Sequence, residues 1–386
     1  MKTFHCDECQ NLVFFENARC LNCGYALAYL PDLSVMAAVQ QQVDGLWRPK
    51  SGADSALSYR LCANYQDKNV CNWAVPESDP DPFCLSCRLT HVIPDLSRNS
   101  REVWYRLEVA KRRLIYGVLS LHLPLNKQDA NTPNGVAFSF LEDSQEPIGD
   151  CGRILTGHND GIITINIAEV DDIKREQQRL QHNEPYRTLL GHFRHEIGHY
   201  YWDRLIAGTA AQDAFRARFG DERMDYAAAL QRHYSLPPPP DWANNFISAY
   251  ASSHPWEDWA ESWAHFMHIT DAVETADAIG LSLTPRRVDE PVLAARTDCA
   301  QAAPPSFDRM IEQWLPLSYV VNNLNRGLGL PDSYPFVLSP VVIEKLRFVH
   351  DTVVAVGRGN QSSGAAVKAA SVEIEAVDNH AAAVNA

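Results

Sequence analysis

The sequence lacks any long uninterrupted run of apolar residues. None of its apolar stretches approaches the ~18 residues that a membrane-spanning helix needs. The first residues also lack the basic-then-apolar order of a secretory signal peptide. We therefore expect a cytoplasmic protein with no membrane partner.

Positive charge is also scarce. The chain has 34 Lys and Arg residues against 48 Asp and Glu residues, for a formal net charge of −14. A chain of this sign repels phosphate overall, which argues against nucleic acid as the partner. One local basic group is small, and we interpret it as a solvated helix face; it consists of Arg98, Arg101, Lys111, Arg112 and Arg113.

The ten cysteines do not follow the pattern of a disulfide framework. C-x2-C pairs in a reducing compartment favour metal ligation over disulfides. Cys6, Cys9, Cys20 and Cys23 form two such pairs that bracket a short strand, as in a zinc ribbon. Four thiolates close a tetrahedral site and leave no position for water, so we expect a structural zinc here.

A second set of four cysteines has wider and less regular spacing: Cys62, Cys71, Cys84 and Cys87. It predicts a second structural zinc, although His91 could replace one thiolate. Which pairs combine into which site stays open, because zinc ribbons can interleave their pairs. The remaining Cys151 and Cys299 are isolated, and we interpret them as ordinary thiols.

A third metal-binding pattern is His-Glu-Ile-Gly-His at residues 195–199. Histidines at i and i+4 lie on one helical face, so His195 and His199 can both reach one Zn²⁺. Glu196 lies beside them, where it can take a proton from water activated by the metal. The pattern predicts zinc-assisted hydrolysis, usually of a peptide bond.

The residues around this pattern predict one amphipathic helix. Asn183-Glu184-Pro185 resembles a helix start, and Gly208 is a plausible stop. Apolar residues recur between them at helical spacing: Leu189, Leu190, Phe193, Ile197, Tyr201 and Leu205. The metal-binding side chains fall on the opposite side of this apolar stripe.

A catalytic zinc needs a third protein ligand. The metzincin solution, a histidine further along the same helix, is excluded by Trp202 and Leu205. Glu257 on a later helix is the candidate, and Glu261, one turn further, would accept the other ring N–H of a ligand histidine. Glu261 is the main alternative ligand and His254 a more distant one.

This order of motifs resembles the gluzincin pattern, in which an acid follows the ligand Glu by four residues. Residues 250–271 are most similar to the lethal-factor type of gluzincin, through Tyr250, Glu257, Ala260, Glu261, Met267, His268, Thr270 and Asp271. The resemblance implies that Tyr250 hydrogen-bonds the oxyanion of the tetrahedral intermediate. The alternative is that Tyr250 is a buried core tyrosine.

Nearly the whole chain resembles a bacterial family of zinc-binding metallopeptidases with an N-terminal zinc-ribbon domain. The segments that carry the likeness are the paired cysteines and residues 157–166, 195–203 and 334–340. The resemblance implies an α+β fold, with a zinc-ribbon module before a mainly helical zincin-like domain that has a small β-sheet. It assigns no physiological substrate.

The chain has 386 residues, 46% of them hydrophobic, which is ample for a core and for more than one domain. We predict a zinc-ribbon module with two four-cysteine sites at 1–95, a metallopeptidase domain at 96–357 and a disordered tail at 358–386. Residues 31–60 are expected to connect the cysteine sets, partly as a helix from Leu33 to Val43.

The remaining elements are predicted from periodicity and breakers. We expect helices at 103–119, 221–234, 305–327 and 340–357, and strands at 136–141 and 162–167. Residues 161–166 are predicted to be the sheet edge that pairs with an extended substrate. The alternative is an interior strand that touches no substrate.

The sequence thus predicts a zinc metallopeptidase with one catalytic and two structural zinc ions, acting on a peptide or protein substrate. Two alternatives remain. One is a non-catalytic zinc-ribbon protein that binds a protein or nucleic-acid partner, and the other is amide hydrolysis of a small molecule. The sequence does not decide between endopeptidase and exopeptidase action, and it gives no oligomeric state.

Overall fold

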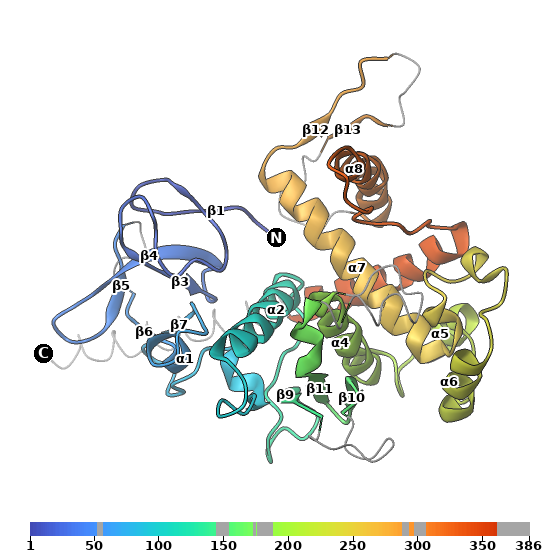
Figure 1. Cartoon of the computed structure of the whole chain (residues 1–386), viewed down its shortest axis with the longest axis horizontal. Coiled ribbons are helices and arrows are strands. Elements are labelled where there is room, and N and C mark those ends of the chain that lie inside the picture. The colour runs from blue at the N-terminus through green and yellow to red at the C-terminus, as the bar shows by residue number, and fades with distance from the viewer. Residues whose placement is uncertain are drawn as a thin grey trace, which may run out of the picture.

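The computed structural model describes residues 1–51, 57–143, 154–172, 175, 188–287, 293–296 and 306–360. It has a mixed α+β fold, in which a cysteine-rich region of short strands precedes a mainly helical region (Figure 1), as predicted. Residues 183–185, Cys151, Cys299 and residues 361–386 lie outside the described part of the chain. Within the described part, no helix is both long and apolar enough to cross a membrane.

The cysteine-rich region contains two antiparallel sheets. Strands β1 (Phe4–His5) and β2 (Leu12–Val13) form a small hairpin. The larger sheet has the order β3-β4-β5-β6-β7, with strands Ala26–Leu30, Val35–Gln41, Trp47–Pro49, Tyr59–Leu61 and Ala74–Pro76. An isolated bridge between Tyr29 and Trp73 brings β3 and β7 together, so the sheet curls towards closure.

The predicted helix from Leu33 to Val43 is wrong, because residues 35–41 form strand β4. The stretch has several Ala and Gln residues, which favour helices, but residues 35–39 pair with β3 and residues 39–41 pair with β5. Met36 and Ala38 face one hydrophobic cluster, and Ala37 and Val39 face another. A strand buried on both faces shows no polar alternation, so tertiary pairing outweighs local propensity here.

The second region has a four-stranded sheet in the order β10-β11-β9-β8 (Gly157–Asn159, Ile162–Asn166, Ala137–Leu141 and Thr90–Val92). Strands β8, β9 and β11 are parallel, and β10 is antiparallel to β11. The turn between β10 and β11 has positive φ at Asp160 and Gly161, which matches a two-residue type I′ hairpin. The strands predicted at 136–141 and 162–167 are confirmed.

The hairpin corrects one prediction about this sheet. Strand β11 is an interior strand, because β10 covers the side that was expected to be the free edge. Buried Ile163 and Ile165 fit that interior position. Among the described strands, β10 is therefore the one at the edge of this sheet near the candidate site, and β11 cannot pair with a substrate there.

Three long helices build the frame of the helical region. Helix α2 (Arg101–Ser120) begins at Ser100, whose side chain accepts a hydrogen bond from the Val103 backbone N–H. Helix α4 (Leu189–Leu205) begins at Thr188 in the same way, and α7 (Pro255–Ala278) has Pro in its first turn. Helix α4 packs against both α2 and α7 (Figure 1).

The other elements are shorter or lie at the periphery. They are α1 (Ala63–Gln66), η2 (Cys87–Leu89), η3 (Ile167–Val170), α5 (Gln212–Phe219), α6 (Tyr226–Ser235), η4 (Trp242–Asn244), η5 (Tyr250–Ser252), β12 (Ser282–Leu283), β13 (Ala295–Arg296) and α8 (Phe307–Gly327). Residues 340–360 are also helical, so 358–360 continue a helix and do not begin the tail. Helix α6 begins later than predicted because Asp225 caps it, and α5 was not predicted.

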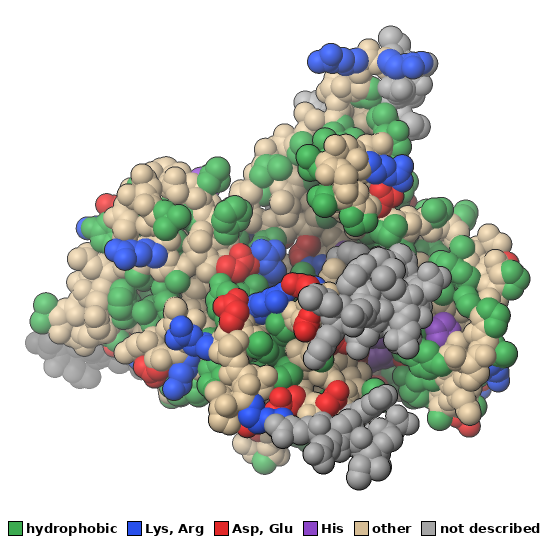
Figure 2. All heavy atoms as spheres, in the orientation of Figure 1, with side chains coloured by type: hydrophobic (Ala, Val, Ile, Leu, Met, Phe, Trp, Pro, Cys, Tyr) green, Lys and Arg blue, Asp and Glu red, His purple; other side chains and the backbone are tan. Residues whose placement is uncertain are grey.

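The two regions share one hydrophobic cluster. Phe4 and Phe15 from the first hairpin lie against Tyr116 of α2, with ring centroids 6.4 and 5.5 Å away. The cluster continues through α2 and α4 to the last helix. The division at residue 95 therefore stays a prediction. Figure 2 shows acidic and basic side chains interspersed near the centre of one face.

Candidate zinc centres

The close packing of α4 against α7 depends on Gly198. A Cβ atom at this position would lie 3.1 Å from the Cα of Ala260 and 3.1 Å from the Cβ of Trp263. The indole Nε1 of Trp259 also donates a hydrogen bond of 2.9 Å to the Gly198 carbonyl. Because the helices approach so closely, the histidine face of α4 and the glutamate face of α7 meet.

Three of the predicted ligands come together at this crossing. The Nε2 atoms of His195 and His199 lie 3.0 and 3.5 Å from Oε2 of Glu257, and the three donor atoms lie within 4.8 Å of one another. Tetrahedral zinc with bonds of ~2.0–2.1 Å places its N and O ligands roughly 3.3 Å apart. Glu257 is only 1% exposed, so water does not compete for it. The donor set therefore fits a zinc ion.

Glu261 occupies the place expected for an acid that orients a ligand. Its Oε1 lies 2.8 Å from Nδ1 of His195, and its Oε2 accepts a hydrogen bond of 2.6 Å from Ser248. Burial alone would raise the pKa of Glu261, but the hydrogen bond and charge of His195 outweigh it and lower this pKa below its ordinary value. His254, the other alternative ligand, caps α7 by accepting from the Trp256 N–H.

Glu196 and Tyr250 border a cavity in front of the three ligands. Its volume is about 340 Å³, and it is lined by Thr156, Gly157, His158, Asn159, Asp160, His195, Glu196, His199, Trp202, Asp203, Tyr226, Tyr250, Trp256 and Glu257. Burial raises the pKa of Glu196. The charges of His195 and His199 act to lower this pKa, but burial outweighs them. The Tyr250 ring lies 5.9 Å from the His195 ring, and burial raises the pKa of its phenol.

Three polar residues of this site were missed by the sequence analysis. Tyr226 on α6 donates a hydrogen bond of 2.6 Å to Oε1 of Glu257. Ser248 supports Glu261, and His158 on β10 stacks on His199 at 6.4 Å. Burial, helped by the charge of His199, lowers the pKa of His158 to about 4. For His158, the sequence signal was the resemblance of residues 157–166 to the family, which pointed to no role. Tyr226 and Ser248 lie outside the segments that carry the resemblance.

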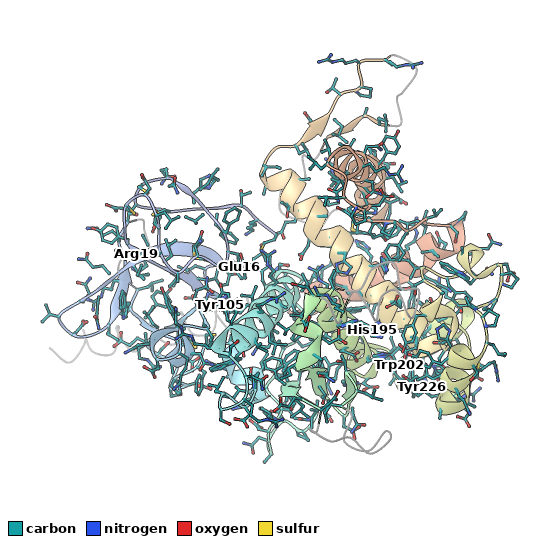
Figure 3. The ribbon with its side chains drawn as sticks, in the orientation of Figure 1. Glu16, Arg19, Tyr105, His195, Trp202 and Tyr226 are labelled. Atoms are coloured by element: carbon teal, nitrogen blue, oxygen red, sulfur yellow. The ribbon has the colours of Figure 1, made fainter. Side chains whose placement is uncertain are left out.

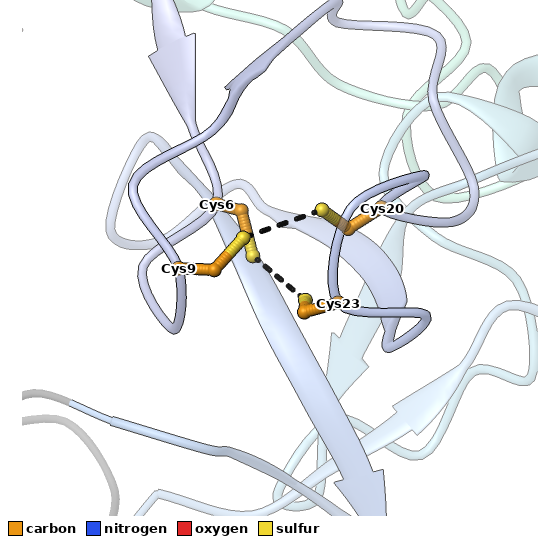
Figure 4. Close-up of side chains that lie close together, drawn as sticks. All are labelled: Cys6, Cys9, Cys20 and Cys23. Carbon is orange, nitrogen blue, oxygen red and sulfur yellow. Dashed lines mark hydrogen bonds between the residues drawn. The ribbon is translucent and has the colours of Figure 1, made fainter.

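The first cysteine set gathers into one site (Figure 4). The Sγ atoms of Cys6 and Cys23 lie 3.6 Å apart, as do those of Cys9 and Cys20. A disulfide needs ~2.05 Å, whereas tetrahedral zinc with bonds of ~2.3 Å places its sulfurs roughly 3.8 Å apart. The separations fit zinc and exclude a disulfide. The two consecutive pairs share one site, so the sets are not interleaved.

The second cysteine set also forms one site, with all four thiols buried. The Sγ atoms of Cys71 and Cys84 lie 3.7 Å apart. The exposed His91 does not belong to this cluster; its Nε2 lies 3.3 Å from the carbonyl of Gln128. Four cysteines are therefore available as ligands of a second zinc ion, as predicted from the sequence.

Two basic residues beside this second site are not on a solvated helix face, contrary to the interpretation of their sequence. Lys111 and Arg112 are both buried. Lys111 forms an ion pair of 2.9 Å with Glu108, and Nη1 of Arg112 donates to the Val70 carbonyl at 2.6 Å. Burial opposes charge on Arg112, but nearby Cys71, Cys87 and Glu108 outweigh it and raise its pKa. Arg112 thus offsets the negative charge of the thiolates.

The different burial of the two cysteine sites predicts an order of zinc release. In the zinc-loaded protein, we expect a chelator to strip the site of Cys9 and Cys23, which are partly exposed, before the buried site of Cys71 and Cys84. Zinc release from the buried site, the slow phase, should be at least about tenfold slower than release from the partly exposed site, the fast phase. This ratio corresponds to roughly 1.4 kcal/mol of extra free energy needed to open the buried site. A metallochromic dye would follow the release. Cys23→Ser should remove a fast phase and leave the slow one, and loss of the slow phase instead would contradict this order.

Comparison with known proteins relates the chain to zinc-binding families. Residues 100–352 match a family described as "Putative zinc-binding metallo-peptidase", and residues 3–98 match a zinc-ribbon domain. Uncharacterized proteins of Mycobacterium bovis and of two Mycobacterium tuberculosis strains are each 41% identical over 355 residues, covering 92% of this chain and 95% of the relative. No solved structure gave a significant match. The family descriptions and the two four-cysteine clusters together support zinc, and the chain belongs to this zinc-binding metallo-peptidase family, with a zinc-ribbon domain at its N-terminal end.

Proposed function

We propose that this chain is a zinc-dependent peptidase of gluzincin type, with one catalytic and two structural zinc ions. His195, His199 and Glu257 would hold the catalytic zinc. The observation that carries the proposal is the convergence of their donor atoms within 4.8 Å, beside buried Glu196 and at the wall of a cavity. The gluzincin assignment rests on the third ligand coming from α7, a different helix from the one that carries the histidines.

Zinc in this site supplies Lewis acidity, which activates water near neutral pH and polarises a carbonyl group. Glu196 is the proposed general base, which takes the proton of the attacking water and passes it to the leaving amine. Tyr250 is proposed to donate a hydrogen bond to the oxyanion as it develops. Glu261 accepts from Nδ1 of His195, which leaves Nε2 of that ring unprotonated and turned towards the metal.

A peptide substrate is favoured by the strand that forms one wall of the cavity. Strand β10 is the end strand of its sheet, and Gly157, His158 and Asn159 line the cavity. The outer backbone groups of an end strand can pair with an extended peptide. A small amide would not need such an edge. A binding protein without catalysis would not need Glu196 beside the metal ligands.

The test of this function is Glu196→Gln, assayed on a mixed peptide library beside the parent. We expect the variant to keep its zinc content and its unfolding midpoint and to lose about 10²–10⁴-fold in turnover, the usual contribution of a general base. Glu312→Gln on the exposed face of α8 is the control and should behave as the parent. Full activity of Glu196→Gln would remove the base role. A zinc-loaded parent that cleaves no peptide would favour the binding-protein alternative.

A further inference from the structure

The two carboxylate oxygens of Glu257 have different partners. Oε2 faces both histidines, at 3.0 Å from His195 Nε2 and 3.5 Å from His199 Nε2. Oε1 accepts a hydrogen bond of 2.6 Å from the Tyr226 hydroxyl. Since Glu257 is almost fully buried, Tyr226 takes the place that water would have at Oε1 on the surface.

The Tyr226 side chain is held in this position from two directions. Tyr226 is the first residue of α6, whose start is fixed by Asp225 accepting from the Ala228 N–H at 3.0 Å. Its ring packs against those of His254 and Trp256, with centroids 5.2 and 5.8 Å away. Figure 3 shows Tyr226 with His195 and Trp202, close to where α4, α6 and α7 meet. The hydroxyl is therefore directed at Glu257 by its surroundings.

A carboxylate can bind a metal through one oxygen or through both, and binding through both uses the position that water needs. A short hydrogen bond from a phenol to a charged carboxylate is strong, and it occupies one of the two oxygens. We propose that Tyr226 is a positioning residue that keeps Glu257 a single-oxygen zinc ligand, so that the remaining position stays open. This inference rests on the proposed function, because it assumes that Glu257 binds the catalytic metal.

The test is Tyr226→Phe, which removes one oxygen atom and keeps the ring contacts. Two properties of the catalytic site would be measured without any substrate. The first is its zinc affinity, by competition with a chelator. The second is the visible spectrum of Co²⁺ exchanged into it, taken as the difference from Glu257→Ala so that the cysteine sites cancel. The d–d bands of Co²⁺ weaken as its coordination number rises.

We expect Tyr226→Phe to lower the zinc affinity about 10–100-fold, as loss of a hydrogen bond to a metal ligand usually does. We also expect weaker Co²⁺ bands than in the parent. Tyr319→Phe is the matched control, because Tyr319 lies on α8, does not line the cavity and has a side chain that is 56% exposed. This control should change neither property. Equal unfolding midpoints would show that all the variants are folded.

Unchanged zinc affinity and an unchanged Co²⁺ spectrum in Tyr226→Phe would overturn the inference. A lower kcat beside these unchanged metal properties would make Tyr226 a hydrogen-bond donor to the substrate and not a positioning residue. Failure of the proposed function itself looks different, because Glu257→Ala would then keep the full zinc content of the parent.

Discussion

Cys84→Ser is expected to unfold helices α4 and α7 together with the cysteine-rich region. Cys84 is buried in the second cysteine site, and Cys87 of the same site begins the turn that leads directly into β8. Strand β8 pairs in parallel with β9 of the four-stranded sheet, through Thr90 and Phe138. The second cysteine site is therefore joined by a short piece of chain to the sheet that carries β10.

Side chains reinforce the same connection. Oε1 of Glu108 on α2 accepts hydrogen bonds of 3.0 Å from Thr90 and 3.2 Å from Trp104, and Lys111 pairs with the same carboxylate. Arg112 lies against the thiolates. Without the metal and its ligands, Arg112 would be a buried charge with fewer partners, which is strongly unfavourable. Helix α2 in turn packs on α4, which carries the histidines.

The expected size of the effect follows from two magnitudes. A structural zinc contributes ~10–16 kcal/mol of apparent binding energy in small zinc domains, whereas a whole domain is stable by only ~5–15 kcal/mol. In the second site, which is joined to the helical region through β8 and α2, loss of one thiolate ligand can therefore remove an amount comparable with the total stability. We expect Cys84→Ser to be insoluble or unfolded, with no catalytic zinc, as measured by zinc content and urea unfolding. Truncation of residues 1–95 should fail in the same way, since it removes β8.

Cys23→Ser is the matched control for this prediction. Cys23 is partly exposed and belongs to the first site, far along the chain from β8. The variant should lose one zinc and keep both the catalytic zinc and the main unfolding transition. If Cys84→Ser instead kept its catalytic zinc and its unfolding midpoint, the cysteine-rich region would be an independent module, as the sequence division at residue 95 implies.

The parts of the fold that the sequence predicts well are those coded by neighbouring residues. The helix predicted at 103–119 lies within α2, and Glu257 and Glu261, predicted to share one helix, lie on α7. His195 with His199, and Glu257 with Glu261, are i,i+4 pairs on single helices, so the spacing alone brings each pair to one face. The structure then places the two pairs opposite one another.

The misses share a physical cause, which is pairing between distant parts of the chain. Strand β4 has helix-favouring residues and is a strand only because β3 lies beside it. The edge of the sheet could not be read from residues 161–166, because it depends on whether β10 folds back over β11. Tyr226 and Ser248 reach the glutamates from segments that carry no metal-binding pattern. Arg112 is charged yet buried because a cluster of thiolates lies beside it, and Lys111 is buried because it pairs with Glu108.

The distance between these two pairs of side chains leads to the second large expected effect, which is loss of the proposed catalytic zinc in Gly198→Val. A Cβ at Gly198 already meets Ala260 and Trp263 at 3.1 Å, and one of these contacts is with backbone. Gly198→Ala requires a shift of only a few tenths of an ångström and gains up to ~1 kcal/mol of helix propensity, so it should fold and bind zinc more weakly. The two extra methyl groups of valine must push the helices apart, at a cost of typically ~1–3 kcal/mol or more in a packed core.

The consequence for the metal site is larger than the consequence for the fold. His195 and His199 move with α4 and Glu257 moves with α7, so a wider helix separation lengthens both distances to Oε2 of Glu257 together. Zinc bonds of ~2.0–2.1 Å tolerate little of this, and we expect Gly198→Val to lose one zinc per chain while the cysteine sites keep theirs. Mass spectrometry of the native protein would count the ions. Gly327→Val is the control, because Gly327 ends α8 with no atom near its Cβ position. A Gly198→Val protein with the full zinc content would mean that loops, and not the contact between these two helices, determine the distance between the histidines and Glu257.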